Sequence, residues 1–504
     1  MTFKKILEQI NLGQILSRVE YKSILLENSL KIYNFIDDIL QNDRKVLLYG
    51  DYDPDGMMCI MVWKEFFRNV GFKNYTIFTY EDRMHTLDPY AVRQAIRMHY
   101  DYIIINDTCT NEMDKINELI KFGVRVIILD HHETKYKYSD YPSNCAIVNS
   151  TLETENKIKV SAGALVYIVL EYYLKTKVKM YDDNNMVCYA LISLYADCIE
   201  MSNEINRAIY YKATSIDTKY LPAEVRMFMK PYDKFSRRFI EFRYTPKLNC
   251  AFRQELFILL NDYVKSKYRG GISEMKERID TLTDIHKKSV EMTERVTDII
   301  TTKELDNFIL ANINSVNSYV NVAQNKLFNY TGLVANKLAD RHGKCCVVWC
   351  SKGNEIKGSF RDLQARDYLK VFQQFCDAQG HKSAFGIHIN PLEFNMFLRY
   401  IEKVDSMYEI EAVDNKPIIV EHVGIEPDLE TLEDMALYNE FSGEIPIALI
   451  KVKIGQGFRQ TKNKFSGYRY RWGSLTVTSS RRLYTNKYEY LKPTVGKKLK
   501  LYVV

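Results

Sequence analysis

Five side chains between residues 53 and 197 are of the types that bind divalent metal ions. They are four carboxylates and one imidazole: Asp53, Asp55, Asp107, His131 and Asp197. Hard carboxylate oxygens with one imidazole favour Mn²⁺ or Mg²⁺ over Zn²⁺, and a bridging carboxylate would hold two ions about 4 Å apart. Two such ions lower the pKa of a bound water and neutralise charge on a phosphodiester. The residues therefore indicate phosphoryl transfer with two divalent cations, Mn²⁺ or Mg²⁺, as cofactors.

Three short apolar runs precede most of these side chains and predict β-strands. The runs cover residues 46–49, 102–106 and 124–129, and helical patterns at 60–70 and 113–122 separate them. This alternation predicts βαβ units and a parallel sheet. Each run ends directly in acidic or histidine residues, so we expect these to meet at the carboxyl edge of the sheet, where α/β proteins bind ligands. Gly56 would allow a tight turn from the first strand into a helix.

The pattern along the whole chain predicts an α/β protein of several domains. We expect a catalytic domain with the parallel sheet, a helical connector containing one long amphipathic helix at 272–300, a second α/β domain, and a small OB-like β-barrel. The expected boundaries are 1–215, 216–310, 311–412 and 413–504. Within the second α/β domain, a strand at 345–350 and a helix at 368–376 are predicted.

Positive charge is concentrated at the end of the chain. Residues 451–504 contain fourteen Lys or Arg and one acid, Glu489, so this segment carries +13 and the remainder −7. Aromatic residues lie between the cations, among which are Arg481 and Arg482. Cations contact phosphates and rings stack on bases, so the segment is interpreted as a track for single-stranded nucleic acid. A solvated basic surface is the alternative.

The ten cysteines lack the regular spacing of a metal motif or a disulfide framework. The closest group, Cys345, Cys346 and Cys350, lies in the apolar run predicted as a strand, which argues against zinc. Free thiols in this number suit a reducing compartment, and the chain starts without a long apolar segment. We therefore expect a cytoplasmic protein that does not bind membranes.

Four motifs resemble those of the DHH phosphoesterase superfamily, and in particular its RecJ-like exonucleases. They stand in the family's order: GDYDPDG at 50–56, NDTCT at 106–110, DHHE at 130–133 and ADCIE at 196–200. The second α/β region resembles the DHH-associated domain, with GSFR at 358–361 and QGHKSAFG at 379–386. The segment NEFSGEIP at 439–446 is similar to the one that leads into the RecJ oligonucleotide-binding barrel.

The resemblance implies roles for individual residues. The five side chains named first would be metal ligands, with Asp51 as a further candidate; Asp130 would orient His131, and His132 would lie against the scissile phosphate. The residues that would hold a terminal 5′ phosphate or face the substrate are Arg253, Ser359, Arg361 and His381. Three positions depart from the family pattern: Tyr49, Gln379 and Asp362, an acid that would weaken the hold of Arg361 on phosphate.

By this resemblance we expect a single-stranded-DNA exonuclease that works from 5′ to 3′ and releases 5′ mononucleotides in DNA repair or recombination. A nanoRNase or cyclic-dinucleotide phosphodiesterase would use the same site, but would not need the basic barrel. A non-catalytic strand-binding scaffold would not need the carboxylates. RNA remains an alternative polymer. A single-strand-binding protein is a candidate partner, and a monomer is expected.

Overall fold

The computed structural model describes most of the chain. The described residues are 3–79, 86–153, 158–231, 233–265, 272–317, 319, 327–362, 366–407, 417–422, 428–441, 447–454, 458–461, 468–479, 483, 488–495 and 499–504. They form two compact units, residues 1–282 with 416–504, and residues 283–415. The α/β fold class predicted from the sequence is confirmed.

A five-stranded parallel sheet forms the centre of the first unit. Its strands, in the order β2-β1-β3-β4-β5, are β2 (Tyr75–Ile77), β1 (Val46–Gly50), β3 (Tyr102–Asn106), β4 (Arg125–Asp130) and β5 (Cys145–Asn149). Most strand residues are buried apolar side chains, as expected for a parallel sheet that is covered on both faces. The three strands predicted at 46–49, 102–106 and 124–129 are confirmed.

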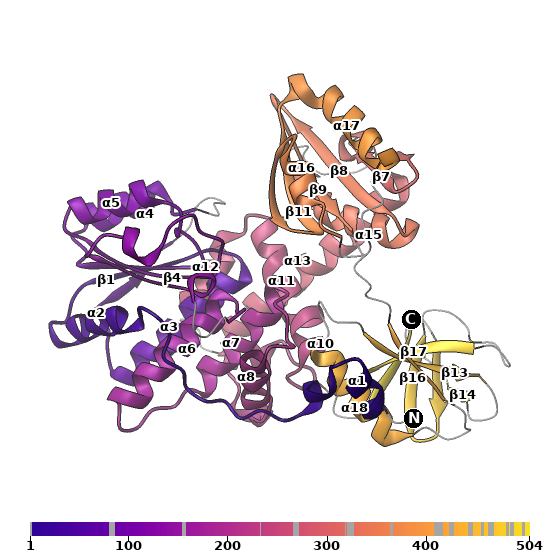
Figure 1. Cartoon of the computed structure of the whole chain (residues 1–504), viewed down its shortest axis with the longest axis horizontal. Coiled ribbons are helices and arrows are strands. Elements are labelled where there is room, and N and C mark those ends of the chain that lie inside the picture. Colours follow the sequence, from indigo (N-terminus) through magenta and orange to yellow (C-terminus); the bar gives the residue numbers. More distant parts are fainter. Residues whose placement is uncertain are drawn as a thin grey trace. The chain divides into compact units, whose positions relative to one another are not determined.

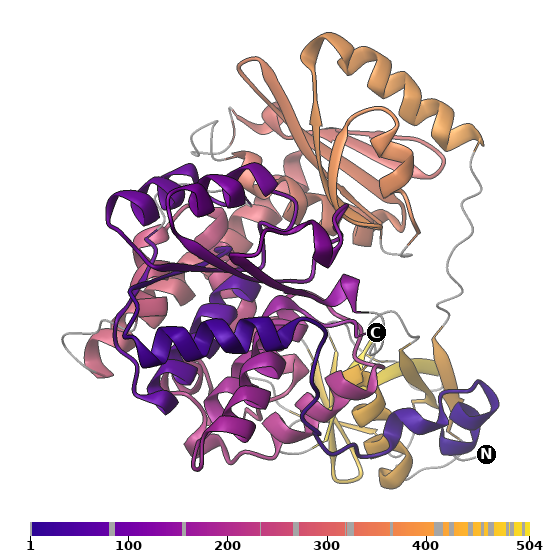
Figure 2. The same cartoon turned by 60° about the vertical axis from the view of Figure 1, so that its left-hand side comes forward.

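Helices cover both faces of this sheet. α4 (Pro89–Arg97) and α5 (Met113–Lys121) lie on one face, and α2 (Ser29–Gln41), α3 (Pro54–Val70) and α6 (Ala162–Lys177) on the other (Figures 1 and 2). α3 is buried along most of its length between the sheet and α6 and α7 (Asn184–Ala196). The smaller helices α8 to α12 follow, at Glu204–Thr214, Ala223–Met227, Arg237–Phe239, Thr245–Arg253 and Phe257–Lys265. None of the helices in the described ranges could span a membrane.

The second unit contains a six-stranded sheet. Its order is β10-β11-β9-β8-β7-β6, with β6 (Thr302–Glu304), β7 (Phe308–Asn312), β8 (Cys345–Lys352), β9 (Glu355–Arg361), β10 (Asp377–His381) and β11 (Ala384–Ile389). Its helices are α15 (Thr331–His342), α16 (Leu369–Gln373) and α17 (Phe394–Met407). α16 is shorter than the predicted 368–376 because the chain extends into β10. The expected boundary at 311 falls inside β7.

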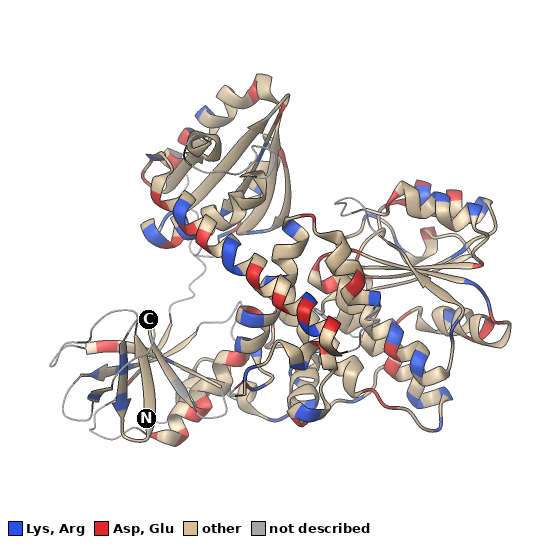
Figure 3. Ribbon diagram, turned by 180° about the vertical axis from the view of Figure 1, so that it is seen from behind, with Lys and Arg blue, Asp and Glu red and all other residues tan. Residues whose placement is uncertain are grey.

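The long amphipathic helix predicted at 272–300 is confirmed as α13 (Ile272–Ile299), and the division between the units falls within it. Charges of both signs alternate along its ribbon (Figure 3). Its carboxyl-terminal half contributes Val296 to the core of the second unit, and Thr293 and Thr297 are buried with their hydroxyls bonded along the helix. The helix is thus a structural element, as its sequence pattern indicates.

The last part of the chain returns to the first unit. A seven-stranded sheet has the order β12-β13-β17-β18-β16-β15-β14, with β12 (Ile418–Glu421), β13 (Ala448–Lys453), β14 (Phe458–Thr461), β15 (Tyr468–Trp472), β16 (Leu475–Ser479), β17 (Tyr488–Thr494) and β18 (Lys500–Val503). The pairs β12–β13 and β16–β18 are parallel and the others antiparallel. That this sheet forms an OB-like barrel stays a prediction.

Helix α18 (Leu429–Phe441) connects the seven-stranded sheet with the domain that contains the parallel sheet. Its Asn439 side chain bonds to the backbone of Ala448 and Pro493 in β13 and β17. The next residue, Glu440, is buried: its carboxylate accepts from the backbone amide of Arg237 at 2.8 Å, and its carbonyl oxygen accepts from the Tyr195 hydroxyl at 3.0 Å. The adjacent residues Asn439 and Glu440 therefore connect the seven-stranded sheet with the helices that carry Arg237 and Tyr195.

Candidate metal centre

The register of the parallel sheet brings three acidic residues to one level. Gly50 pairs with Asn106, and Asn106 pairs with Leu129, so the next residues in each strand are Asp51, Asp107 and Asp130. β1 also has β2 on one side and β3 on the other, which makes the β1–β3 boundary a topological switch point. Crossovers leave this point toward opposite faces and open a crevice at the carboxyl ends of the strands. The acids therefore lie where such sheets bind ligands.

The turn from β1 into α3 is built around Asp53 and Gly56. Asp53 caps α3, with one carboxylate oxygen accepting from the amides of Asp55 at 2.9 Å and Gly56 at 3.0 Å. A Cβ atom on Gly56 would come within 2.0 Å of the Asp51 carbonyl oxygen, so no other residue fits without moving the backbone. The tight turn predicted at Gly56 is confirmed, and it holds three acids on one short loop.

Asp55 is fixed by a second helix. Its two carboxylate oxygens accept from the first amides of α6, Ala162 and Gly163, each at 2.9 Å, and from the Ser193 hydroxyl on α7. A helix amino terminus stabilises a carboxylate through its free amides and dipole. Sequence reasoning missed Ser193 and the α6 amides. The available signal was a serine one helical turn before Asp197 in an otherwise apolar run.

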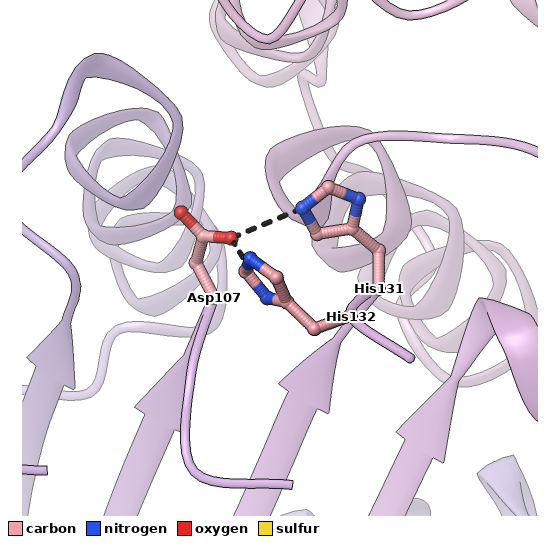
Figure 4. Close-up of side chains that lie close together, drawn as sticks. All are labelled: Asp107, His131 and His132. Atoms are coloured by element: carbon pink, nitrogen blue, oxygen red, sulfur yellow. Dashed lines mark ion pairs between the residues drawn. The ribbon is translucent and has the colours of Figure 1, made fainter. Parts of the chain in front are cut away.

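The imidazole of His131 lies close to three carboxylates. Its Nε2 lies 3.3 Å from an oxygen of Asp107, 3.6 Å from one of Asp197 and 3.8 Å from one of Asp55. Figure 4 shows His131 and His132 directed toward the same oxygen of Asp107, with His132 Nδ1 at 3.9 Å. The ring of His131 is therefore held among three carboxylates that come from different elements.

Three groups of side chains have ligand atoms close enough to share an ion. They are Asp107 with His131 and His132, Asp55 with His131 and Asp197, and Asp51 with Asp53 and Asp107; within each, the atoms lie within 4.8 Å of one another. Asp107 and His131 each belong to two groups. The structure thus brings together all five predicted ligands and Asp51, and Asp107 is shared between two of the groups.

The crowding of carboxylates appears in their pKa values. Burial, and after it the charges of Asp55 and Asp53, raise the pKa of both Asp107 and Asp197 well above the usual range. Carboxylates this close in a buried site repel one another when ionised, and a divalent cation removes that repulsion. Oxygen-rich, acidic and with one shared imidazole, the donor set fits hard cations such as Mn²⁺ or Mg²⁺.

Asp130 behaves differently because its charge is compensated. Its Oδ1 accepts from His132 Nδ1 at 2.7 Å and from the amides of His131 at 2.8 Å and His132 at 3.2 Å, and its Oδ2 accepts from the Thr110 hydroxyl. Burial alone would raise the pKa of Asp130, but the hydrogen bond and charge of His132 lower it below its usual range. Burial likewise opposes ionisation of His132, yet Asp130 raises its pKa to about 9.

This geometry differs from the expectation that Asp130 orients His131. The ring that Asp130 holds at hydrogen-bond distance is that of His132, and its contact with His131 is through the backbone amide. The reason is positional: the Asp130 carboxylate caps the turn that follows β4, and the second residue of that turn bends back over it. Asp130 therefore holds the ring of His132 and not that of His131.

Backbone strain accompanies the site. Asp107 and Cys109 follow β3 with φ values of 61° and 80°, a left-handed conformation that non-glycine residues adopt rarely. Such strain costs on the order of 1–3 kcal/mol and persists where the surroundings determine the conformation. Here the turn directs the Asp107 carboxylate back toward His131, so strain and ligand geometry occur in the same residue.

The predicted phosphate-binding residues of the second unit lie side by side. Ser359 and Arg361 share one face of β9, and the Ser359 hydroxyl lies 3.0 Å from that of Thr331 at the start of α15. A Cβ atom on Gly332 would come within 2.8 Å of the Arg361 guanidinium. The glycine therefore leaves the room that the guanidinium occupies beside the helix amino terminus.

Asp362 has a partner that sequence reasoning did not foresee. It is buried, and the guanidinium of Arg366 binds both of its oxygens, at 3.0 and 3.1 Å. A bidentate pair of this kind offsets the charge of the carboxylate. Because Arg366 compensates the charge of Asp362, we expect Asp362 to weaken the hold of Arg361 on phosphate less than its sequence position suggests.

The other predicted substrate residues are more widely distributed. Arg253 is the last residue of α11 and belongs to the first unit, whereas Ser359 and Arg361 belong to the second. His381 ends β10, but its side chain lies outside the described part of the structure. Arg481 and Arg482 also lie outside the described residues. Tyr49, at the departure from the family pattern, is buried, and its hydroxyl donates to the Thr86 carbonyl at 2.9 Å.

Comparison with known proteins places this site in a family. Residues 45–199 match the family model described as "DHH family, N-terminal domain", a range that encloses the whole cluster from Asp51 to Asp197. The chain therefore carries a DHH-family domain.

The chain also resembles a known protein beyond this domain. It is similar to the single-stranded-DNA-specific exonuclease RecJ of Bacillus subtilis (strain 168), with 23% identity over 398 residues, which is 75% of this chain and 47% of the relative. The chain thus spans about half the length of the curated relative it matches.

Solved structures of RecJ from Thermus thermophilus share the fold. The complex with Mn²⁺ has a TM-score of 0.75 at 14% identity and covers 99% of this chain and 74% of that one. The complex with Mg²⁺ has a TM-score of 0.71 at 13% identity and covers 99% and 73%. The similarity therefore extends over both units.

Proposed function

We propose that the protein is a metal-dependent exonuclease that hydrolyses single-stranded DNA from 5′ to 3′ and releases 5′ mononucleotides. The observation that supports this most is the convergence of Asp107, His131 and their neighbouring carboxylates at the switch point of the parallel sheet. The similarity to a single-stranded-DNA-specific exonuclease supports the choice of substrate.

Two divalent cations, Mn²⁺ or Mg²⁺, would be held by Asp53, Asp55, Asp107, His131 and Asp197, with Asp51 as a further ligand. When bound, such ions supply an activated water and neutralise charge on a phosphodiester. The similar RecJ structures contain Mn²⁺ or Mg²⁺. Asp107 is the candidate bridging ligand, because it belongs to two of the three groups.

His132 and Asp130 would act on the scissile phosphate. His132 is more than half exposed, at 58% for its side chain, and Asp130 keeps it protonated near neutral pH. A protonated imidazole donates a hydrogen bond to a phosphate oxygen and complements its charge. Thr110 fixes the other oxygen of Asp130 and so fixes the direction in which His132 points.

The 5′ phosphate would be held by Ser359 and Arg361 in the second unit, and Arg253 and His381 are further proposed substrate-binding residues. The support within the structure is the neighbouring placement of Ser359, Arg361 and the first turn of α15. A guanidinium grips phosphate bidentately, and a helix amino terminus favours an anion. Polarity and the preference for a 5′ phosphate rest on the resemblance.

The seven-stranded sheet is the proposed single-strand track. Along β15, Arg469 and Arg471 are exposed, whereas Tyr470 and Trp472 are buried at 4% and 1% exposure. The alternation assigns the cations to the surface and these rings to the core. Among the described aromatic side chains of the segment, Tyr488 is the most exposed, at 58%, and is the first candidate for base stacking. Arg481 and Arg482 would extend the track.

A small phosphodiesterase for dinucleotides or cyclic dinucleotides is the second candidate, because it would use the same carboxylates. One assay separates the candidates. Single strands labelled at the 3′ end, with and without a 5′ phosphate, are offered beside duplex DNA, RNA and a dinucleotide, in Mn²⁺ and in Mg²⁺. We expect stepwise loss of nucleotides from the 5′ end of the DNA strand. Cleavage of the dinucleotide alone would contradict the proposal.

The track is tested separately. Neutralising Arg481 and Arg482 together should weaken binding of a single strand and reduce the steepness of its salt dependence, since each phosphate contact releases counterions. Cleavage of a dinucleotide, which is too short to reach the track, should be unchanged. An unaltered affinity for the long strand would remove these arginines from the track.

A further inference from the structure

A second hollow lies at the opposite end of α3 from the metal centre. Its volume is about 610 Å³, and residues of α3, α4, the edge strand β2 and the end of α12 line it. Asp55 stands in the first turn of α3 and Arg68 in the last, so about 20 Å of helix separates the two places at 1.5 Å per residue. Cavities of this size bind small molecules.

The lining of this hollow is positive. Lys64, Arg68, Lys73 and Lys265 take part, and none of the described residues that line it is acidic. Lys73 and Arg68 are exposed, and Arg68 also forms an ion pair with Glu65, which is not among the lining residues. Burial lowers the pKa of Lys64 to about 8, so a bound anion would stabilise its charged form. The carbonyl end of α3 disfavours an anion, and the cations of the lining oppose this effect.

Aromatic and hydrogen-bonding groups line the rest. The ring of Phe67 lies 4.7 Å from that of Tyr75 and 5.0 Å from that of Phe72, and the planes of Phe72 and Tyr75 are inclined by 20°. Gln94 and Thr76 add groups that both donate and accept hydrogen bonds. Cations, flat apolar surface and amide and hydroxyl groups together match a phosphorylated ligand that carries a heteroaromatic ring.

We propose that this hollow, the α3–β2 pocket, is a second binding site, separate from the metal centre, for a nucleoside 5′-monophosphate. The phosphate would lie among Lys64, Arg68 and Lys73, and the base would lie against the ring of Tyr75. This second site goes beyond the proposed nuclease function, which uses the other end of α3. Binding of a nucleotide in the α3–β2 pocket does not require nuclease activity.

The test is calorimetric titration of the full chain with AMP and dAMP in EDTA, which keeps metal-dependent binding out of the measurement. We expect one saturable site. Lys73→Glu should weaken it about tenfold, which is 1.4 kcal/mol, by placing repulsion beside the phosphate. Tyr75→Leu should weaken AMP but leave the weaker binding of inorganic phosphate unchanged. Lys121→Glu, at an exposed lysine on α5, is the matched control and should bind AMP normally.

Asp107→Asn should also bind AMP normally, which separates this site from the metal centre. Loss of AMP binding in that variant would assign the nucleotide to the catalytic crevice and overturn the proposal. Three other results would also overturn the proposal. They are equal affinity for AMP and inorganic phosphate, equal affinity for AMP in Lys73→Glu and the unmodified protein, and no binding at millimolar AMP. A negative nuclease assay would leave these readouts unaffected.

Discussion

At the scale of single residues, the metal centre is a set of charges that destabilise one another in the absence of cations. Burial and neighbouring carboxylates raise the pKa of Asp107, and each unit of such a shift corresponds to about 1.4 kcal/mol. The same proximity that disfavours ionisation creates the affinity for divalent ions. Stability without metal and binding of metal should therefore respond in opposite directions to the loss of one charge.

Asp107→Asn should show this directly. We expect a higher melting temperature in EDTA, because a buried charge is removed, together with loss of most of the stabilisation by Mn²⁺. Cleavage should fall by roughly three orders of magnitude or more, since the proposed bridging ligand is lost. Differential scanning fluorimetry and the strand assay measure both. Asp114→Asn, at an exposed position on α5, is the control and should change neither quantity.

The stabilisation by Mn²⁺ should also grow with pH. Asp107 and Asp197 have raised pKa values in the folded, metal-free protein, so their contribution to its stability is present at low pH and is lost as pH rises through those values. Binding of a cation requires the ionised carboxylates. The shift in melting temperature between EDTA and Mn²⁺ should thus be larger at about pH 8 than at about pH 6. An equal shift at both would contradict this.

The sequence predicts the convergence of these side chains because several of them follow the ends of parallel strands. Asp107 and His131 need only the order of strand and helix to be placed at one edge. Ser193 and the amides of Ala162 and Gly163, by contrast, reach Asp55 from helices whose position is set by tertiary packing. No spacing rule brings them there. The pairing of Asp130 with His132 likewise depends on the shape of one turn.

At the scale of elements, the turn between β1 and α3 is the most constrained part of the site. Gly56→Ala should cost roughly 3 kcal/mol or more, because its Cβ would overlap the Asp51 backbone, and should weaken Mn²⁺ binding. Gly123→Ala is the comparison: its φ of 84° is unfavourable for alanine, but nothing lies within 4 Å, so about 1 kcal/mol is expected. Chemical denaturation of both variants measures the difference. Equal costs would show that the close approach is not what requires Gly56.

At the scale of the whole molecule, α18 joins the seven-stranded sheet to the helices behind the metal centre. Around the buried Glu440 stand Arg237, Tyr210, Glu241 and Lys492, and burial raises the pKa of Glu440 to about 7. The Tyr195 hydroxyl, two residues before Asp197, bonds to the Glu440 carbonyl. The proposed track and the proposed metal ligand Asp197 are thus connected through a few buried side chains.

Glu440→Gln tests this connection. The folded protein holds a proton on Glu440 that the unfolded chain releases from about pH 4.5, so this contribution to stability is lost as pH rises through 7. We compare the melting temperatures of Mn²⁺-saturated proteins at about pH 6 and about pH 8. Between these values, the melting temperature of Glu440→Gln should fall less than that of the unmodified protein. Glu433→Gln, at an exposed position on α18, should keep the full decline. An unchanged decline in Glu440→Gln would mean that this carboxylate does not titrate in that range.

The equal level of the strand ends has a consequence for how the chain tolerates changes in length. One residue inserted within β3 would turn every following side chain to the opposite face and carry Asp107 away from its neighbours. The same insertion in the turn after α5, around Gly123, would be absorbed at the distant edge of the sheet. Homologous chains should therefore differ in length at that edge and keep constant the count of residues from each strand to its acid.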